Sequence, residues 1–229
     1  MKKKLIIFGT ASTAELVHHY FINDSDYEPV AFCANDEYVK EDNFLGLPLL
    51  PFSKIEMKFS PKEYSFFCAV GQRELNSIRK DVYLKAKALG YSMASYISSK
   101  SDIANNVKIG EHCYIDDIKI CPHARIGNNC FIHSNISHHT KVEEHCFISA
   151  NVSMGGIVSI SEQTFIGLNS TIRDNIIIGE RCIIGAGSII MHNTGADKVF
   201  ISNETKAQRI SSIIFSRGLV EGGKKNGEQ

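Results

Sequence analysis

The sequence predicts a two-domain protein, with a small α/β domain followed by a left-handed parallel β-helix. Three observations predict it: an aliphatic residue or Met at every sixth position over residues 136–190, a small or short side chain four residues after most of these, and strand–helix alternation over residues 1–97. A six-residue period fits neither a helix, at about 3.6 residues per turn, nor a strand, at about 2. It fits a solenoid of triangular coils, in which three six-residue segments complete one turn.

The repeat is expected over residues 98–203, in three registers separated by slips. The registers are marked by Ile103, Ile109 and Ile115, by Ile120, Ile126 and Ile132, and by the run from Ile136 to Ile190. The first slip drops one residue and the second, just before Ile136, drops two. Because a slip makes the backbone bulge and re-aims side chains, both slips are candidate functional positions. Residues 204–229 are expected to form a C-terminal cap followed by a disordered tail over 221–229.

The first 97 residues alternate between apolar strands and helices. Strands are predicted over residues 3–8, 28–33, 65–70 and 92–97, and helices over 14–21 and 75–89. This order predicts a parallel sheet with helices on its faces, in the manner of a Rossmann-like domain. Ligands of such sheets bind at the carboxyl ends of the strands, which here are residues 9–13, 35–36 and 71–73.

Composition excludes several classes of protein. Lys plus Arg and Asp plus Glu balance at 25 each, so charge gives no reason to expect nucleic acid as a partner. Lys2–Lys4 precede only a short apolar run, too brief for a signal peptide or a membrane span. We therefore expect a cytoplasmic protein that inserts into no membrane. Because a solenoid leaves flat sides to cover, a homotrimer of parallel prisms is the expected assembly.

The cysteines and histidines are the candidate chemical groups. Four of the seven cysteines, namely Cys113, Cys130, Cys146 and Cys182, take the small corner slot of a repeat, which predicts buried, reduced and inert thiols. Four histidines lie close together in the chain: His133, His138, His139 and His145. They fit general acid–base chemistry by one imidazole, a metal site shared between subunits, or a polar surface loop. No carboxylate is placed to orient a metal-bound imidazole, so no metal is expected.

The order of the two domains resembles that of the bacterial sugar acyltransferases that act on bacillosamine-type, nucleotide-linked amino sugars. The sialic acid O-acetyltransferases are relatives of the same build. The motifs that carry the resemblance are Ile6–Gly9, Ala69–Gly71, Asn76–Lys80, Ile136–His139, Met154–Val158 and Gly185–Ser188. It implies an acetyl-CoA-dependent acetyltransferase of bacterial surface glycan biosynthesis, whose acceptor is the amino group of a nucleotide-linked amino sugar.

The resemblance also implies roles for individual residues. His138 would be the general base, beside His139, and the Gly156 N–H would stabilise the oxyanion. Acetyl-CoA would lie along Gly155, Gly156, Gly185 and Ala186. The nucleotide would bind near Gly9, Thr10, Ala11, Asp36 and Arg79.

Three departures from the family pattern stand out. The family has an acidic residue after the catalytic histidine, whereas here it is His139, so Glu143 or Glu144 is expected to orient His138 instead. A second family histidine corresponds to Phe147, and His145 is the expected replacement. The phosphate turn has one glycine, Gly9, and hydroxyls of Thr10, Ser12 and Thr13 are its expected substitutes.

Three alternatives stay open. The acceptor atom can be a sugar oxygen rather than a nitrogen. A zinc-dependent hydratase of the carbonic anhydrase type would gather His133, His138 or His145 around one zinc between subunits. A scaffold or sugar-binding module would use the repeats only for assembly.

Overall fold

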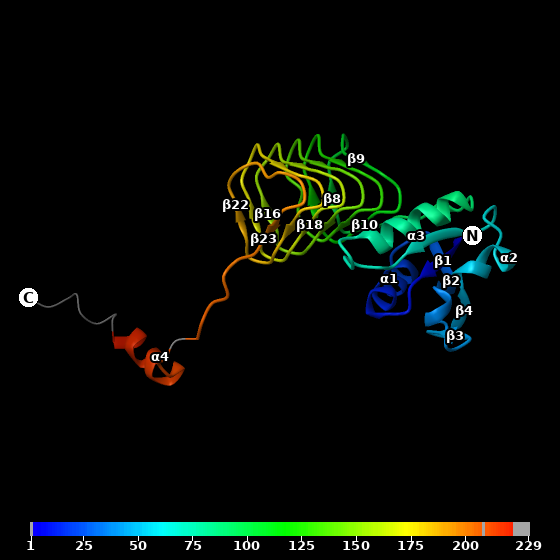
Figure 1. The fold of residues 1–229 in the computed structure, drawn as a ribbon, viewed down its shortest axis with the longest axis horizontal. Coiled ribbons are helices and arrows are strands. Elements are labelled where there is room, and N and C mark those ends of the chain that lie inside the picture. Colours follow the sequence, from blue (N-terminus) through cyan, green and yellow to red (C-terminus); the bar gives the residue numbers. More distant parts are fainter. Residues whose placement is uncertain (1, 208, 222–229) are drawn as a thin grey trace, which may run out of the picture.

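The computed structural model describes residues 2–207 and 209–221. An α/β domain is followed by a parallel β-helix and a C-terminal helix, α4 (Ser212–Glu221), as Figure 1 shows. Of the tail expected over residues 221–229, all but the first residue lie outside the described residues. No helix in the described ranges is both long enough and apolar enough to cross a membrane.

The α/β domain is built on one six-stranded sheet. Its elements are β1 (Lys3–Phe8), α1 (Ser12–Asn23), β2 (Tyr27–Ala34), β3 (Asn43–Phe44), β4 (Leu47–Pro51), α2 (Ile55–Lys58), β5 (Ser65–Cys68), α3 (Ser77–Ala88) and β6 (Ser92–Met93), with short 3-10 turns at Asp36–Tyr38 and Phe52–Lys54. The strand order is β3-β4-β2-β1-β5-β6, and every pair is parallel except β3–β4.

Alternate residues of β1 face two different cores. Leu5 and Ile7 pack in one core with α1, while Ile6 and Phe8 pack in the other with α2 and α3. The sheet therefore has helices on both faces, which explains why its central strands are almost continuously apolar. These last four residues of β1 are all buried, whereas Lys3 and Lys4 at its start are exposed.

Two sequence expectations for this domain are wrong. The sequence predicts no strand between residues 33 and 65, where a loop with Gly46, Pro48 and Pro51 is expected, but β3 and β4 form a hairpin there. Its turn residues Leu45 and Gly46 both have positive φ. Its prolines are tolerated because β4 lies near the sheet edge. The single strand expected over residues 92–97 is two strands. β6 ends the α/β sheet, and β7 (Tyr96–Ile97) pairs with the β-helix.

The β-helix has three faces of short parallel strands. The first face holds β7, β10 (Tyr114–Ile115), β13 (Phe131–Ile132), β15 (Phe147–Ile148), β18 (Phe165–Ile166), β21 (Ile183–Ile184) and β23 (Val199–Phe200). The second holds β9 (Lys108–Ile109), β12 (Arg125–Ile126), β14 (Lys141–Val142), β17 (Ser159–Ile160) and β20 (Ile177–Ile178). The third holds β8 (Asp102–Ile103), β11 (Lys119–Ile120), β16 (Ser153–Met154), β19 (Thr171–Ile172) and β22 (Ile189–Ile190).

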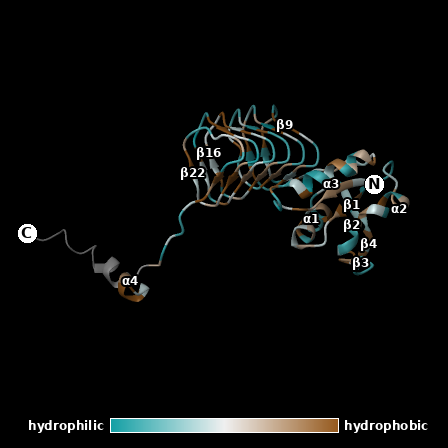
Figure 2. Ribbon diagram, in the orientation of Figure 1, coloured by the Kyte–Doolittle hydropathy of each residue, from teal (hydrophilic) through white to brown (hydrophobic). Residues whose placement is uncertain are grey.

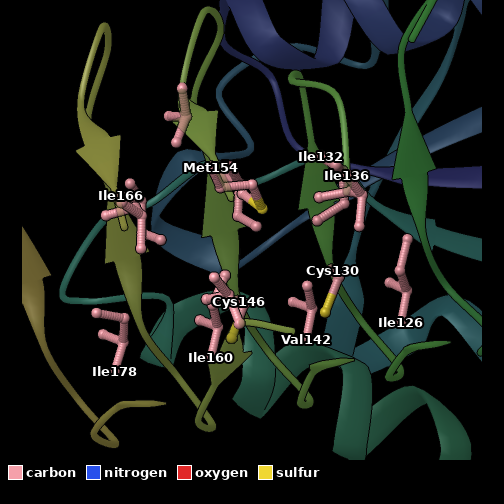
Figure 3. Close-up of a cluster of buried hydrophobic side chains, with 14 of the residues drawn as sticks. Ile126, Cys130, Ile132, Ile136, Val142, Cys146, Met154, Ile160, Ile166 and Ile178 are labelled. Atoms are coloured by element: carbon pink, nitrogen blue, oxygen red, sulfur yellow. The ribbon is translucent and has the colours of Figure 1, made fainter. Parts of the chain in front are cut away.

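The six-residue repeat forms this coil because each aliphatic residue stacks on its equivalent one turn away. These residues point inward and make one continuous core, part of which Figure 3 shows. The cysteines share that core at one corner. The thiols of Cys113, Cys130 and Cys146 donate to carbonyl oxygens at 3.2, 3.1 and 3.2 Å, and all three residues are fully buried. Their predicted structural role is confirmed.

The third face is interrupted at the second slip. Ile136 forms only an isolated bridge to Ile120, and the ladder of β16, β19 and β22 starts afresh beyond it. Across the break, the hydroxyls of Ser134 and Ser137 donate to the carbonyl oxygens of Val152 and Met154, both at 2.7 Å. Side chains thus replace the missing strand pairing.

The first face is the one that meets the α/β domain. Its outward positions carry an aromatic ladder, Tyr96, Tyr114, Phe131, Phe147 and Phe165. Tyr96, Tyr114 and Phe131 share a core with β1, β5 and α1. Beyond the last coil, α4 exposes Ile213, Ile214 and Phe215, and Figure 2 shows the start of this helix as hydrophobic.

Candidate active site

His138 lies against the backbone of Gly156 at a corner of the coil. This histidine corner, residues 137–140 and 155–158, leads from the third face to the second. The two turns are joined by the bond from Ile157 N to His138 O, at 2.9 Å. A Cβ at residue 156 would overlap His138 Cε1 and Nε2, so only glycine leaves room for this imidazole. The structure thus brings His138 and Gly156, two of the candidate catalytic residues, into contact within one protomer.

The two neighbouring glycines differ in what their N–H groups do. Gly155 N donates to Ile172 O at 3.0 Å and belongs to the coil's backbone network. Gly156 O accepts from Asn175 N at 2.9 Å, but within the described residues no protein acceptor receives the Gly156 N–H. A free N–H beside an exposed imidazole can stabilise a developing oxyanion.

His139 takes the place of the expected carboxylate. Its Nδ1 lies 3.2 Å from Nδ1 of His138, with the two rings edge to face. His139 in turn stacks on His123 at 4.5 Å, and Asn106 Nδ2 lies 3.0 Å from His123 Nδ1. One of the two facing Nδ1 atoms must carry the proton. When that atom is His138 Nδ1, its Nε2 lone pair is free to accept a proton.

Neither glutamate proposed to orient His138 does so. Glu144 Oε1 accepts from Asn128 Nδ2 at 2.6 Å, on the far side of the coil turn. Among the described residues, Glu143 makes no hydrogen bond to His138. The expectation is wrong because residues 143 and 144 belong to the next corner, beyond β14.

His145 is buried and cannot replace the second family histidine. Its Nδ1 lies 2.7 Å from Asn129 Nδ2, which must be the donor, so His145 Nδ1 is an acceptor. Only 2% of its surface is exposed, and burial lowers the pKa of His145 to about 4. The residue therefore belongs to the junction between the domains and is closed to any shared zinc.

His145 continues a buried chain of hydrogen bonds. Cys68 N donates to His112 Nε2 at 2.7 Å, so His112 carries its proton on Nδ1 and donates to Asn129 Oδ1 at 2.8 Å. Burial lowers the pKa of His112 to about 3. Sequence reasoning missed His112 and Asn129, although the chain holds a signal: these residues and His145 are spaced by 17 and 16, one coil turn each.

Arg79 is the cation of this junction, and the expectation that it binds a nucleotide is wrong. It is fully buried. Its guanidinium donates to Asn129 Oδ1 at 3.1 Å, Cys146 O at 3.1 Å and Gly71 O at 3.0 Å, and lies 4.4 Å from the Phe131 ring centre. Burial lowers the pKa of Arg79 to about 10, so it remains a cation at neutral pH.

The motif Asn76–Lys80 therefore joins the domains. Asn76 Nδ2 donates to Thr164 O at 3.4 Å, and Lys80 Nζ pairs with Glu162 at 2.6 Å. Together with Arg79, these residues present one end of α3 to the coil, because positions three and four apart share a helix face.

The remaining nucleotide candidates lie at one edge of the sheet. Gly9, Thr10 and Ala11 follow β1, and Asp36 follows β2. Gly9 has φ of +128°, and a Cβ there would lie 3.1 Å from Ala69 O, so the turn requires glycine. Asp36 accepts from Ser53 Oγ at 2.9 Å and lines a pocket of about 690 Å³.

Gly185 and Ala186 lie at a different corner from His138. Residues 149–152, 167–170 and 185–188 form the glycine corner, which leads from the first face to the third. The bond from Gly187 N to Leu168 O, at 2.8 Å, stacks two of these turns. The strands β16, β19 and β22 separate this corner from the histidine corner. The two groups of cofactor candidates therefore flank the third face.

In the described ranges, no three His, Cys, Asp or Glu side chains are grouped so as to hold a metal ion.

Comparisons with known proteins agree with this architecture. The bacterial transferase hexapeptide family, described as six repeats, matches residues 157–192. No curated protein matches the chain.

Several solved structures share the fold over most of the chain. A point mutant of perosamine N-acetyltransferase from Caulobacter crescentus, in complex with CoA and GDP-perosamine, is 19% identical with a TM-score of 0.76, over 90% of this chain and 97% of that one. WeeI from Acinetobacter baumannii AYE is 18% identical with a TM-score of 0.70, over 88% and 97%. The acetyltransferase domain of PglB from Neisseria gonorrhoeae FA1090, in complex with acetyl coenzyme A, is 19% identical with a TM-score of 0.59, over 86% and 97%.

Proposed function

We propose that this protein is an acetyl-CoA-dependent acetyltransferase whose acceptor is the amino group of a nucleotide-linked sugar. The observation that carries the proposal is the contact between His138 and Gly156, which sets a proton acceptor beside a free backbone N–H. The shared fold supports it, because solved structures of that fold are named as acetyltransferases and hold CoA or acetyl coenzyme A.

The chemistry follows from these two groups. His138 Nε2 takes the proton of the acceptor nitrogen as that nitrogen attacks the acetyl carbonyl. The Gly156 N–H donates to the carbonyl oxygen while negative charge develops there. The thioester supplies an activated acetyl group: the C–N bond forms at its carbonyl carbon, and the C–S bond then breaks to release CoA as the thiolate, which takes up the proton held by His138. His139 is a positioning residue, since it contacts Nδ1 of His138 and leaves Nε2 free.

The α/β domain would hold the nucleotide. Gly9, Thr10, Ala11 and Asp36 lie at the carboxyl edge of the parallel sheet, where such sheets bind ligands. The proposal includes a Rossmann-like role for this domain. The strand order supports it, because β2 and β4 follow one another on one side of β1 and β5 and β6 follow one another on the other side. Gly155, Gly185 and Ala186 would contact acetyl-CoA along the flanks of the third face.

The proposal also covers the pathway, the location and the assembly of the protein. The reaction would serve bacterial surface glycan biosynthesis in the cytoplasm, with three chains associating through their coils. Analytical ultracentrifugation tests the trimer, and a single species with the mass of one chain would refute it.

The activity is tested by incubating the protein with acetyl-CoA and a panel of UDP-, dTDP- and GDP-linked amino sugars. Free thiol release and the product mass are the readouts, and hydroxyl-bearing sugars without an amine test O-acetylation. His138→Asn should lower kcat by about 10²–10⁴-fold. His192→Asn, a change at another exposed histidine of the coil, is the matched control. Unchanged turnover in His138→Asn would exclude His138 as the general base, and no thiol release with any sugar would favour a non-catalytic scaffold.

A further inference from the structure

The interruption of the third face opens a pocket that the sequence did not predict. It has a volume of about 580 Å³, within the range of roughly 300–1,000 Å³ usual for small-molecule sites. It exists because the second slip removes two residues before Ile136. On the third face, Ile136 therefore pairs with Ile120 of the preceding coil turn and not with β16 of the following one. We call it the third-face pocket.

Both apolar and polar side chains line this pocket. Ile118, Val152 and Met154 supply apolar surface, while the other lining residues carry hydroxyl, amide, imidazole or carboxylate groups. A hydroxylated ring has the same two kinds of surface, C–H groups on its faces and hydroxyls on its edge. The polar lining groups can form hydrogen bonds with the ring hydroxyls, and such contacts give a site its specificity.

His133 on the pocket wall is held in one orientation. Its Nδ1 lies 2.8 Å from Asp116 Oδ2, and its ring packs between Tyr114 and Phe147, with ring centres 5.2 and 5.3 Å away. An ionised Asp116 only accepts, so the proton is on Nδ1. Neutral His133 therefore keeps a lone pair on Nε2 for a ligand donor, such as a hydroxyl or an amine.

Charge decides which part of a nucleotide-linked sugar fits here. Asp117 lines the pocket, and no lysine or arginine does. Phosphate would be repelled, because a negative group with no cation beside it disfavours a second negative charge. A sugar ring, above all one with a protonated amine, carries no such penalty.

The third-face pocket adjoins the candidate catalytic pair. Ser137 and Met154 line it, where Ser137 directly precedes His138 in the chain and Met154 lies two residues before Gly156. A ring in the pocket would therefore lie beside the histidine corner, between the two corners that hold the acetyl-CoA candidates.

We propose that the third-face pocket binds the pyranose ring of the amino-sugar acceptor, with His133, oriented by Asp116, accepting a hydrogen bond from the sugar. The inference rests on the proposed acetyl transfer only in naming the sugar as the acceptor. Binding of a sugar in this pocket does not depend on that transfer. Asp116 is a positioning residue in this arrangement, and His133 sets specificity.

Direct binding tests the proposal without acetyl-CoA. Saturation-transfer NMR of the full chain would use glucosamine, galactosamine and mannosamine as probes. Ser153→Leu places a larger side chain at an exposed strand position that lines the pocket. Thr171→Leu makes the matched change one turn further along the same face, where Thr171 pairs with Ser153. Ser153→Leu should weaken binding of at least one sugar by about tenfold or more, and Thr171→Leu should leave it unchanged.

His133→Gln is the second variant. It should raise KM for the acceptor by about tenfold while KM for acetyl-CoA stays constant, because only the sugar contact is lost. A purely structural role would change both constants or neither. Circular dichroism checks that each variant is folded.

The outcomes separate the two proposals. Thiol release that is insensitive to both Ser153→Leu and His133→Gln overturns the pocket and leaves the acetyltransferase standing. Sugar binding that is sensitive to Ser153→Leu, without thiol release from acetyl-CoA with any acceptor sugar, keeps the pocket and overturns the acetyl transfer. No binding of any of the three sugars overturns the pocket outright.

Discussion

Two groups of histidines on one coil have opposite surroundings. At the domain junction, His112 and His145 are buried and connected through Asn129 beside the Arg79 cation. At the histidine corner, His138 and His139 are exposed and contact only each other and nearby turns. His138 and His145 are close in sequence, yet one fits proton transfer and the other fits structure. The difference teaches that a histidine's role here is set by what covers its corner of the coil.

The largest effect should come from breaking the junction. Arg79→Leu leaves buried carbonyl oxygens of both domains without a donor, and should lower the free energy of unfolding by about 1–3 kcal/mol for each of them. Arg73→Leu changes an exposed arginine nearby and should stay within about 0.5 kcal/mol. Urea denaturation measures both. Equal losses in the two variants would mean that the buried guanidinium has no special role.

The junction should also make stability depend on pH. Burial lowers the pKa of His112 to about 3 and that of His145 to about 4, whereas a histidine in the unfolded chain has a pKa of about 6.5. At a pH between the folded and the unfolded pKa, these two histidines are protonated in the unfolded chain but not in the folded one. Stability should therefore be full above about pH 6.5 and fall by about 1.4 kcal/mol per pH unit for each histidine as pH drops. Urea midpoints at pH 7, 6 and 5 measure it, and a flat profile would contradict the buried network.

At the exposed corner, the same kind of change should affect activity and not stability. Gly156→Ala places a methyl group where the His138 imidazole lies, and should lower kcat by about 10²-fold by displacing that ring. Gly195→Ala is the control, because a Cβ there would meet only Lys198 Cε at 3.7 Å. Thiol release and thermal unfolding are measured side by side. A large loss of stability with intact turnover would reverse the assignment of this corner.

The smallest effect is expected at the rim of the junction. Lys80 and Glu162 pair at 2.6 Å, but their side chains are 29% and 44% exposed. Solvent screens such a pair, so Lys80→Ala should cost about 0–1 kcal/mol. A loss of several kcal/mol in urea denaturation would show that the junction depends on its rim as well as on Arg79.

Sequence reasoning was most successful where contacts are local. Each inward aliphatic residue stacks on its equivalent one turn away, so a six-residue period suffices to predict the coil and the structural role of Cys113, Cys130 and Cys146. The contact of His138 with Gly156 was also within reach, because 18 residues make one turn. The hairpin β3–β4 was missed because β3 is only two residues long and β4 contains two prolines, so neither strand carries a clear pattern.

The sequence by itself determined the coil and its slips, since both follow from the repeat. Only the tertiary structure decided the roles of Arg79 and His145, which depend on where the α/β domain packs on the first face. It also decided that the second slip leaves a pocket rather than a filled corner. The physical reason is the same in both cases. Burial and cavity shape arise from surfaces that meet in space, and a period along the chain does not specify which surfaces meet.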